Sequence, residues 1–274
     1  MNGIYNIGNS CYLNSALQML FNSTDFVDIC RDTVFENIIN NYKSSKIFNP
    51  TEIKAIVAKN NKMFNNTQQQ DSFEFIIYLF DTLDKILGST KNYDNLLYNK
   101  FGIIITTNIK CKMSNCNKDS NTNVTELFLQ LPITDELDLS DSYRKYKSMT
   151  ILQDDNSYYC DNCKTKVLAR KNTITTKWPD SLIIVFKRFD YQMRKDNRSI
   201  NVPLTWRHGY KLKGAIIHMG SYGGGHYIYF GHTNQDSNQW FIANDSSISK
   251  INDIDSFINH QGKQSYILYY EKDK

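Results

Sequence analysis

Three features that would each mark a particular class of protein are absent from this 274-residue sequence. Charge of one sign is not in excess: 32 basic and 28 acidic residues leave a net charge of +4, and the basic residues are dispersed, which does not indicate binding to nucleic acid. The longest apolar run, Phe75 to Phe80, has six residues, whereas a membrane-spanning helix needs about twenty. Met1 to Tyr5 lack the charged start and apolar core of a secretory signal peptide. We therefore expect an intracellular protein of the cytoplasm or nucleus, monomeric and bound neither to membranes nor to nucleic acid.

Cysteine is also scarce, with six residues in the chain. In an intracellular protein such cysteines are thiols or metal ligands more often than disulfides. Hydrophobic residues at 41% and charged residues at 22% are values of a globular protein, and a chain of this size can build a large core without disulfides. The sequence therefore predicts one globular domain over residues 1–274.

One of the cysteines stands at the junction of a polar turn and a predicted helix. Apolar residues recur at helical spacing from Leu13 to Phe21, so Asn9 or Ser10 is the expected cap and Cys11 lies in the first turn. Unpaired N–H groups at a helix N-terminus favour the thiolate, which is the nucleophilic form of cysteine. Asn6, five residues upstream, can donate from its amide to a developing oxyanion. Taken alone, Cys11 would more often be a buried structural thiol.

A histidine far along the chain gives Cys11 a functional context. His226 follows three glycines, and Asn244 and Asp245 come directly after a later predicted strand. A nucleophilic cysteine, a distant histidine, and an asparagine or aspartate behind it are the residues of a cysteine protease, whose partners meet in space and not in sequence. Neighbouring side chains on a strand point to opposite faces, so only one of Asn244 and Asp245 can orient the imidazole directly.

The residues around these positions resemble the motifs of the ubiquitin-specific proteases. Gly-Asn-Ser-Cys-Tyr at residues 8–12 is similar to the cysteine box of that family. Gly-Gly-His-Tyr at residues 224–227, with Asn-Asp-Ser at residues 244–246, is similar to its histidine box. Lesser motifs follow in the family's order, namely residues 69–75, two cysteine pairs, residues 186–189 and His218. The resemblance runs from Gly3 to Tyr270.

The resemblance implies an α+β, papain-like cysteine protease fold. A helical thumb would cover about residues 1–100, zinc-bearing fingers about 101–190 together with palm strands, and a β-rich palm about 181–274. It implies a thiol-dependent deubiquitinase that binds ubiquitin and ubiquitinated proteins and hydrolyses the isopeptide or peptide bond after the C-terminal glycine of ubiquitin. Two alternatives stay open: a weak or inactive ubiquitin-binding module of the same fold, and a protease for a ubiquitin-like modifier.

The same resemblance assigns a role to each candidate residue. Cys11 is the nucleophile, and His226 takes its proton and later protonates the leaving amine. The motif match assigns the orientation of His226 to Asn244, and Asn6 helps to form the oxyanion hole. Asp245 would then lie nearer the oxyanion side or the solvent. The contacts with substrate fall to Gln70, Asp71, Glu74 and Tyr227.

Asp71 and Glu74 also have a purely structural interpretation. An apolar face from Ile76 to Leu87 predicts a helix over residues 71–87 that ends at Gly88, with both acids on one face of its first turn. Acids at that place cap a helix whatever its function. The resemblance implies that they bind arginines of the ubiquitin tail, and capping uses only part of the acceptor capacity of a carboxylate. Both interpretations stay open.

Two close pairs of cysteines are spaced like the ligands of one metal ion. Cys111 and Cys116 are separated by four residues, and Cys160 and Cys163 by two. Two such pairs in an intracellular chain suit one tetrahedral, structural Zn²⁺, and no catalytic cofactor is expected. The ubiquitin-specific proteases usually have two residues inside the first pair, so the four here are a departure, and loops held by ordinary packing are the alternative. Cys30 is left over and is expected in the core.

The remaining segments give coarser expectations. Residues 22–66 show only weak helical patches. Strands are predicted over residues 101–107, 124–131, 181–189, 210–219, 226–232, 239–243 and 265–270. Gly223 to Gly225 are expected to allow positive φ and a close approach of the substrate backbone beside His226. His218 is a second candidate base, but it fits a hydrogen-bonded strand residue better.

Overall fold

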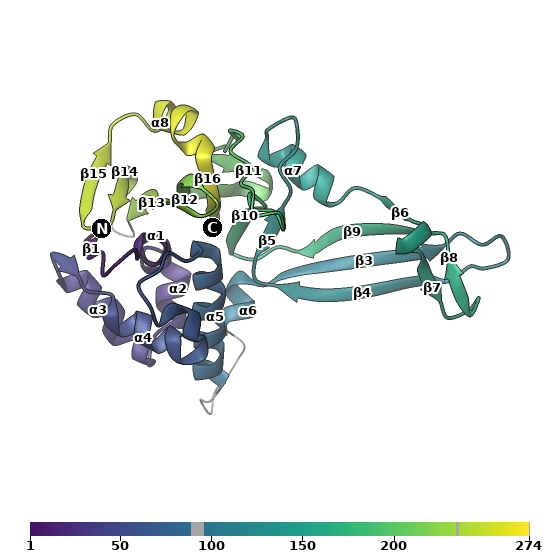
Figure 1. Cartoon of the computed structure of the whole chain (residues 1–274), viewed down its shortest axis with the longest axis horizontal. Helices are drawn as coiled ribbons and strands as arrows, with labels where there is room; N and C mark the ends of the chain where they lie inside the picture. The colour runs from purple at the N-terminus through teal and green to yellow at the C-terminus, as the bar shows by residue number, and fades with distance from the viewer. Residues whose placement is uncertain (89–95, 234–235, 274) are drawn as a thin grey trace.

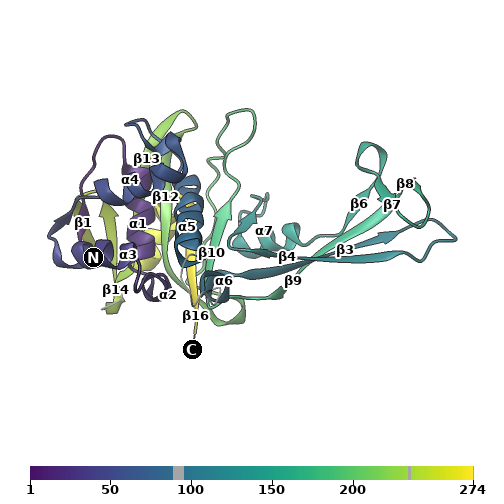
Figure 2. The same cartoon turned by 90° about the horizontal axis from the view of Figure 1, so that it is seen from below.

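The chain folds into a helical layer packed on a sheet, from which a second, elongated sheet projects (Figure 1, Figure 2). The structure is a computed structural model that describes residues 1–88, 96–233 and 236–273. Helices and strands both build the fold, which confirms the predicted α+β class. No helix within these three stretches is both long enough and apolar enough to cross a membrane.

The helical layer is centred on α1 (Cys11–Phe21), all of whose residues are buried. Helix α5 (Ser72–Gly88) packs beside α1 and buries the apolar face that its periodicity predicts. The other elements of this layer are β1 (Gly3–Ile4), α2 (Thr24–Ile29), α3 (Val34–Ser44), β2 (Ile47–Phe48), α4 (Thr51–Asn60), η1 (Lys62–Phe64) and α6 (Leu96–Phe101). Cys30 lies in its core, as expected.

The central sheet has eight strands in the described part of the chain. Its order is β15-β14-β13-β12-β16-β10-β5, and β11 pairs with β12. All neighbouring strands are antiparallel except β10 and β5. The strands are β5 (Leu129–Leu131), β10 (Ser181–Phe186), β11 (Thr205–Trp206), β12 (Tyr210–Ser221), β13 (Gly224–Thr233), β14 (Asp236–Asn244), β15 (Ser247–Ile251) and β16 (Ser265–Lys272). Their connections include α7 (Leu139–Tyr146), η3 (Arg207–Gly209), α8 (Ile254–His260) and η4 (Gly262–Gln264).

Two hydrophobic cores lie on opposite faces of the central sheet. Alternate residues of a strand point to opposite faces. Along β10, Ile183 and Val185 therefore join the core that contains α1 and α5, whereas Leu182 and Ile184 join the core that contains residues of α7 and α8. Every residue of β10 is buried. The unbroken apolar run of this strand reflects cover on both faces of the sheet.

The elongated sheet has the strand order β4-β3-β9-β6, and a β7-β8 hairpin lies near its far end (Figure 1). Its elements are β3 (Ile103–Cys111), β4 (Asp119–Glu126), β6 (Thr150–Leu152), η2 (Asp154–Asn156), β7 (Tyr158–Cys160), β8 (Thr165–Val167) and β9 (Ala169–Lys177). Nearly all residues of β4 are exposed, so this sheet has little hydrophobic core of its own.

The prediction of one continuous strand over residues 124–131 is wrong. Strand β4 ends at Glu126 and pairs with β3 in the elongated sheet, whereas β5 begins at Leu129 and pairs with β10 in the central sheet. Between them the chain passes from one sheet to the other, and Phe128 packs edge-on against Phe73 of α5. Periodicity carries no information on which sheet a strand joins, so the break has no local signal.

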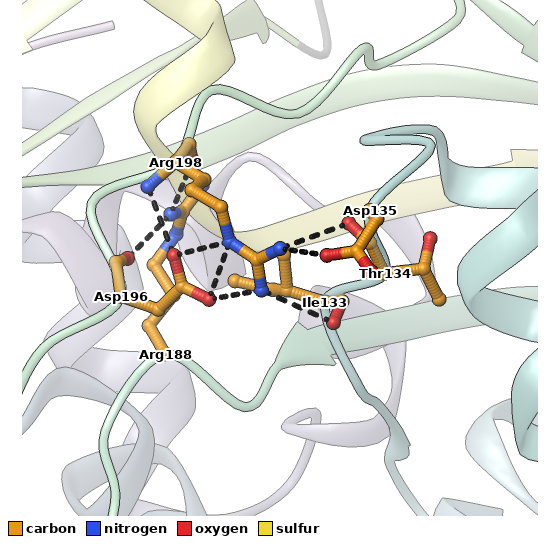
Figure 3. A network of polar contacts seen from close by, with 6 residues as sticks. All are labelled: Ile133, Thr134, Asp135, Arg188, Asp196 and Arg198. Carbon is orange, nitrogen blue, oxygen red and sulfur yellow. Dashed lines mark hydrogen bonds and ion pairs between the residues drawn. The ribbon is translucent and has the colours of Figure 1, made fainter.

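A buried arginine fixes the loop that follows β10 (Figure 3). Arg188 is 1% exposed and donates hydrogen bonds to four backbone carbonyls, those of Asp196, Arg198, Lys263 and Ser265. Burial lowers the pKa of Arg188 to about 10, so it remains charged at neutral pH. Arg198 is held in turn by the carboxylates of Asp196 and Asp135. This network sets the path of the loop that begins with Phe189.

Candidate active site

Cys11 is the first residue of α1, and only 2% of its surface is exposed. Helix α1 lies against β13, and the backbone N–H of Tyr227 is directed at the thiol. Burial raises the pKa of the Cys11 thiol, and the N–H groups of Tyr227 and Tyr12 offset this only in part. The expected preference for the thiolate at the helix N-terminus is therefore outweighed, because the thiol loses more hydration than the helix restores. Ser10 is the N-cap, but its hydroxyl accepts from the Ile7 N–H and not from the helix.

His226 and Asn244 face each other across neighbouring strands. His226 lies near the start of β13, Asn244 ends β14, and Nε2 of the imidazole lies 2.7 Å from Oδ1 of the amide. An amide oxygen accepts but does not donate, so Nε2 carries the proton in this contact and Nδ1 is the free nitrogen. The next residue along β13, Tyr227, directs its N–H at Cys11, so the backbone that carries His226 passes beside the thiol.

Asp245 is directed at the N-terminal segment. It follows β14 in a left-handed turn with φ of 50°. Its carboxylate accepts hydrogen bonds from the side-chain amides of Asn6 at 2.9 Å and Asn14 at 2.7 Å, and its carbonyl accepts from the Ile4 N–H at 2.9 Å. Adjacent residues thus have different partners: Asn244 contacts the imidazole, and Asp245 contacts the segment that leads to the nucleophile.

Asn6 is fixed at both ends of its amide. Its Oδ1 accepts from the N–H groups of Gly8 and Ser10, both at 3.1 Å, while its Nδ2 donates to Asp245. Because the amide nitrogen carries two hydrogens, one is left to donate elsewhere. Asn14 donates to the same Asp245 carboxylate, and sequence reasoning did not identify it as a site residue. Its one signal is a polar residue on the buried face of an apolar helix, where it is 2% exposed.

A groove of about 570 Å³ lies between the start of α5 and the central sheet. Its walls come from residues 69–71, 73, 74 and 77, from Gln130, from Phe189 and Asp190 after β10, and from His218, Tyr222, residues 223–225, Tyr227 and Tyr266. Gly225 and Tyr227 flank His226 in the chain, so the groove leads to the candidate catalytic pair.

Asp71 caps α5 from the position just before Ser72. Its Oδ1 accepts from the N–H groups of Phe73 at 2.7 Å and Glu74 at 3.0 Å. The hydroxyls of Tyr227 and Tyr266 also donate to this carboxylate, each at 3.2 Å. Burial raises the pKa of Asp71 in spite of these four donors. Most of the acceptor capacity of Asp71 is therefore used within the protein.

The other three predicted substrate contacts line the same groove. Gln70 donates to the Met63 carbonyl at 3.2 Å, and the hydroxyl of buried Tyr227 is directed at Asp71. Glu74 is exposed, and partial burial together with the charge of Asp71 raises its pKa. Among the described residues, no hydrogen bond or ion pair engages the Glu74 carboxylate, so it can accept from a ligand in the groove.

Residue 225 is a glycine because neighbouring atoms lie too close for a Cβ, and not because its φ angle requires one. A Cβ on Gly225 would overlap Nε2 of His218 and the carbonyl of Met219. The expectation of positive φ within residues 223–225 is wrong, because the left-handed glycine of this hairpin is Gly220. Gly220 lies in β12 directly opposite Gly225, and Gly225 is required for close packing.

His218 and Gln69 support the strand that carries His226. His218 is 3% exposed, its ring lies 4.4 Å from that of Tyr227, and burial lowers its pKa to about 4, so it is neutral at pH 7. Its Nδ1 has no hydrogen-bond partner. Gln69, which sequence reasoning did not single out, accepts from the Gly225 N–H at 3.0 Å and donates to the Gly225 carbonyl. These bonds tie the start of β13 to the segment before α5.

Four cysteines converge at the far end of the elongated sheet. The sulfurs of Cys111, Cys116, Cys160 and Cys163 all lie within 4.8 Å of one another. The Cys111–Cys163 and Cys116–Cys160 sulfurs are 3.9 and 3.7 Å apart. Thiolates at about 2.3 Å from a tetrahedral ion are separated by about 3.8 Å, so this cluster has the dimensions to hold a metal ion. The Lys118 N–H and the Asn162 amide lower the pKa of the Cys116 thiol to about 6, which favours its ligand form.

Comparison with known proteins identifies the family of the chain. The family model described as ubiquitin carboxyl-terminal hydrolase matches residues 2–270. The chain belongs to this family. Among curated members, it is 28% identical to a probable ubiquitin carboxyl-terminal hydrolase 16 of Schizosaccharomyces pombe, covering 98% of this chain and 66% of that one. It is 28% identical to ubiquitin carboxyl-terminal hydrolase 9 of Saccharomyces cerevisiae, covering 87% of this chain and 36% of that one. The chain thus spans between about a third and two thirds of these hydrolases.

Two solved structures of one deubiquitinase module share the fold. A chain of the SAGA DUB module Ubp8/Sgf11/Sus1/Sgf73 bound to monoubiquitin superposes with a TM-score of 0.83 at 22% identity, covering all of this chain and 69% of that one. The same module bound to ubiquitin aldehyde gives a TM-score of 0.81 at 22% identity and covers 70% of that chain. The predicted fold class is confirmed.

Proposed function

We propose that this chain is a thiol-dependent deubiquitinase that hydrolyses the isopeptide or peptide bond after the C-terminal glycine of ubiquitin. One observation carries the proposal: Nε2 of His226 lies 2.7 Å from Oδ1 of Asn244, while the residue after His226 directs its N–H at Cys11. A cysteine nucleophile needs such an oriented base. The names of the relatives, and the ubiquitin bound in the two similar structures, support ubiquitin as the substrate.

His226 activates the nucleophile in this mechanism. Burial raises the pKa of Cys11, so the thiolate forms as an ion pair with the imidazolium when Nδ1 takes the proton. The sulfur attacks the scissile carbonyl, and the intermediate collapses to a thioester as His226 gives its proton to the leaving amine. His226 then deprotonates a water molecule, which hydrolyses the thioester and restores Cys11. Asn244 holds the proton on Nε2 throughout.

Asn6 and backbone N–H groups near Cys11 form the oxyanion hole. Asp245 takes one of the two amide hydrogens of Asn6, which leaves the other to donate to the oxyanion. Asp245 is then a positioning residue for the oxyanion hole, and Asn244 is the orienting residue of the base.

The groove takes the C-terminal tail of ubiquitin. Glu74 meets a basic side chain of the tail, because its carboxylate is exposed and the charge of Asp71 adds to the negative potential. Asp71 contributes less to binding the tail directly, since four hydrogen-bond donors already surround its carboxylate. Gln70 and Tyr227 line the walls along which the tail runs.

Zn²⁺ is the ion that fits the four cysteines, because a closed set of four thiolates is the donor set of structural zinc. Cys111 ends β3 and Cys116 lies in the turn to β4, while Cys160 ends β7 and Cys163 lies in the turn to β8. When bound, the ion would join the two hairpins and take no part in the reaction at Cys11. The elongated sheet then forms the fingers that grip the globular part of ubiquitin, within the thumb (about 1–100), fingers (about 101–190) and palm (about 181–274) of one domain.

Ubiquitin with a C-terminal electrophile tests the proposal directly. We expect the chain to gain the mass of one ubiquitin through Cys11. The Cys11→Ser variant should bind ubiquitin without reacting, because the hydroxyl is a far weaker nucleophile but nearly isosteric. Cys30→Ala is the matched control, since Cys30 is buried in the same layer away from the groove, and it should react normally.

Other outcomes of this experiment identify the alternatives. Reaction with a probe built on a ubiquitin-like modifier, but not on ubiquitin, would change the substrate and keep the mechanism. Ubiquitin binding without an adduct would indicate an inactive binding module. Neither binding nor an adduct would contradict the proposed function.

A further inference from the structure

We propose that a second pocket, outside the active site, binds a phosphate monoester. The pocket lies between α7 and the β11–η3 segment and has a volume of about 180 Å³. This volume is sufficient for one phosphate group. Its lining residues are Ser140, Tyr143, Arg144, Lys147, Trp206 and Arg207. None of them lines the groove or belongs to the cysteine cluster.

Arg207 enters this pocket without an acidic partner. Its guanidinium lies over the rings of Tyr143 at 4.4 Å and of Trp178 and Trp206 at 5.6 Å. In the described part of the chain it forms no ion pair, and its Nε is buried without a hydrogen-bond acceptor. Aromatic faces hold a guanidinium in place but satisfy none of its N–H groups. The stacked side chain is therefore oriented in advance for an acceptor that the protein itself does not provide.

Lys147 adds a second charge beside Arg207. Its ammonium lies 5.4 Å from the centre of the same Tyr143 ring, and no described carboxylate pairs with it. Two cations on one ring repel each other unless an anion lies near both. Arg144 is a third cation of the pocket wall, although Asp141 pairs with it. Two positive charges of the pocket are thus left without counter-charges.

The remaining polar groups of the pocket are donors as well. The Trp206 Nε1–H donates to Oγ of Ser140 at 3.2 Å, which leaves the Ser140 hydroxyl hydrogen free for another acceptor. Of the two carboxylates at the start of α7, Asp138 is occupied as the cap of that helix and Asp141 by Arg144. The pocket therefore presents converging hydrogen-bond donors, and none of its described lining residues is a carboxylate.

These properties select a phosphate monoester among anions. The group has three terminal oxygens and a charge of about −1.5 to −2 at neutral pH, which matches the two unpaired cations and several donors. Arginine fits phosphate oxygens in a planar, two-bond geometry, and clusters of arginine with lysine recognise phosphorylated segments. A carboxylate offers two oxygens and one charge, so it would leave donors of this pocket unpaired.

Binding can be followed by tryptophan fluorescence of the full chain, because Trp206 lines the pocket and Trp178 stacks on Arg207. The probes are inorganic phosphate and a blocked tripeptide with a central phosphoserine. We expect saturable binding that Arg207→Gln and Lys147→Gln each weaken by about tenfold. Lys46→Gln removes one exposed charge from the helical layer and should leave the affinity unchanged. If Arg207→Gln fails to fold, the Lys147→Gln variant alone tests the proposal, because Lys147 is exposed.

The source of the phosphate and the specificity of the site follow from the same titrations. Tighter binding of the tripeptide than of inorganic phosphate assigns the pocket to a phosphorylated polypeptide, and equal or tighter binding of inorganic phosphate would overturn the assignment to a monoester. No saturable binding, or an equal loss in Lys46→Gln and Arg207→Gln, would overturn the proposal.

Discussion

Asn244 and Asp245 are neighbours in the chain whose side chains have different partners, and their substitution separates two roles. Asn244→Ala removes the acceptor at Nε2 of His226, so kcat should fall by about 10- to 100-fold with KM little changed. Asp245→Ala should cost less turnover, because Oδ1 of Asn6 still accepts from Gly8 and Ser10. Steady-state kinetics with a fluorogenic ubiquitin substrate gives both values. The opposite order would make Asp245 the orienting residue and leave the protease proposal intact.

A second prediction at this scale concerns pH. Burial lowers the pKa of His218 from 6.5 to about 4, so between these values the unfolded chain binds a proton that the folded chain does not. Stability is therefore lost as pH falls through this window, and His218 alone should remove about 2 kcal/mol of unfolding free energy between pH 7 and pH 5. Urea unfolding at both pH values measures the loss. In His218→Gln the difference should shrink by that amount, and an unchanged difference would contradict the assignment.

At the scale of elements, the start of α5 combines a cap with a site for substrate. Glu74→Ala should raise KM for ubiquitin substrates with little effect on stability, because the exposed carboxylate has no partner in the described protein. Asp71→Ala should lower the unfolding free energy by about 1 kcal/mol or more, since it removes the helix cap and leaves two tyrosine hydroxyls without an acceptor. Kinetics and urea unfolding of both variants distinguish these roles. A higher KM at unchanged stability in Asp71→Ala would make Asp71 a direct tail contact as well.

The hairpin β7-β8 has little packing of its own, so we expect the proposed metal ion to stabilise it. Its core cluster consists of three of the cysteines and Val167, so a bound ion supplies most of the cohesion there. We expect elemental analysis to find one Zn²⁺ per chain, and Cys160→Ser with Cys163→Ser to abolish it. Hydrogen exchange should then lose protection in β7 and β8 and keep it in the central sheet. A metal-free wild-type chain with the same protection would refute the zinc proposal.

Local patterns allowed some of these elements to be predicted and hid others. The first turn of α1, helix α5 and the cysteine pairs depend on residues a few positions apart, so spacing alone identified them. Asn14 and Gln69 are different, because their partners Asp245 and Gly225 lie far along the chain. The rise in the pKa of Cys11 was missed for the same reason, since burial by β13 is set by the tertiary fold and not by the helix that carries the thiol.

For the whole molecule, the central sheet links the regions that the proposed reaction requires. Strand β10 pairs with β5, which follows directly from the elongated sheet, and β13 carries His226 against α1. The proposed grip on ubiquitin and the proposed cleavage of its tail would therefore both depend on one sheet with cores on both faces. This arrangement could be expected only from the family resemblance, because composition and periodicity do not specify strand order.

The bond from Asn6 to Asp245 spans 239 positions of the chain, and this has a consequence for protein synthesis. A ribosome releases the N-terminal end first, so Cys11 leaves the exit tunnel long before His226, Asn244 and Asp245 exist. Until β13 and β14 are made, the Cys11 thiol has no base and Asn6 lacks its hydrogen bond to Asp245. A nascent chain therefore carries a cysteine without its base, and the proposed proteolytic activity requires that the chain has been made at least as far as Asp245.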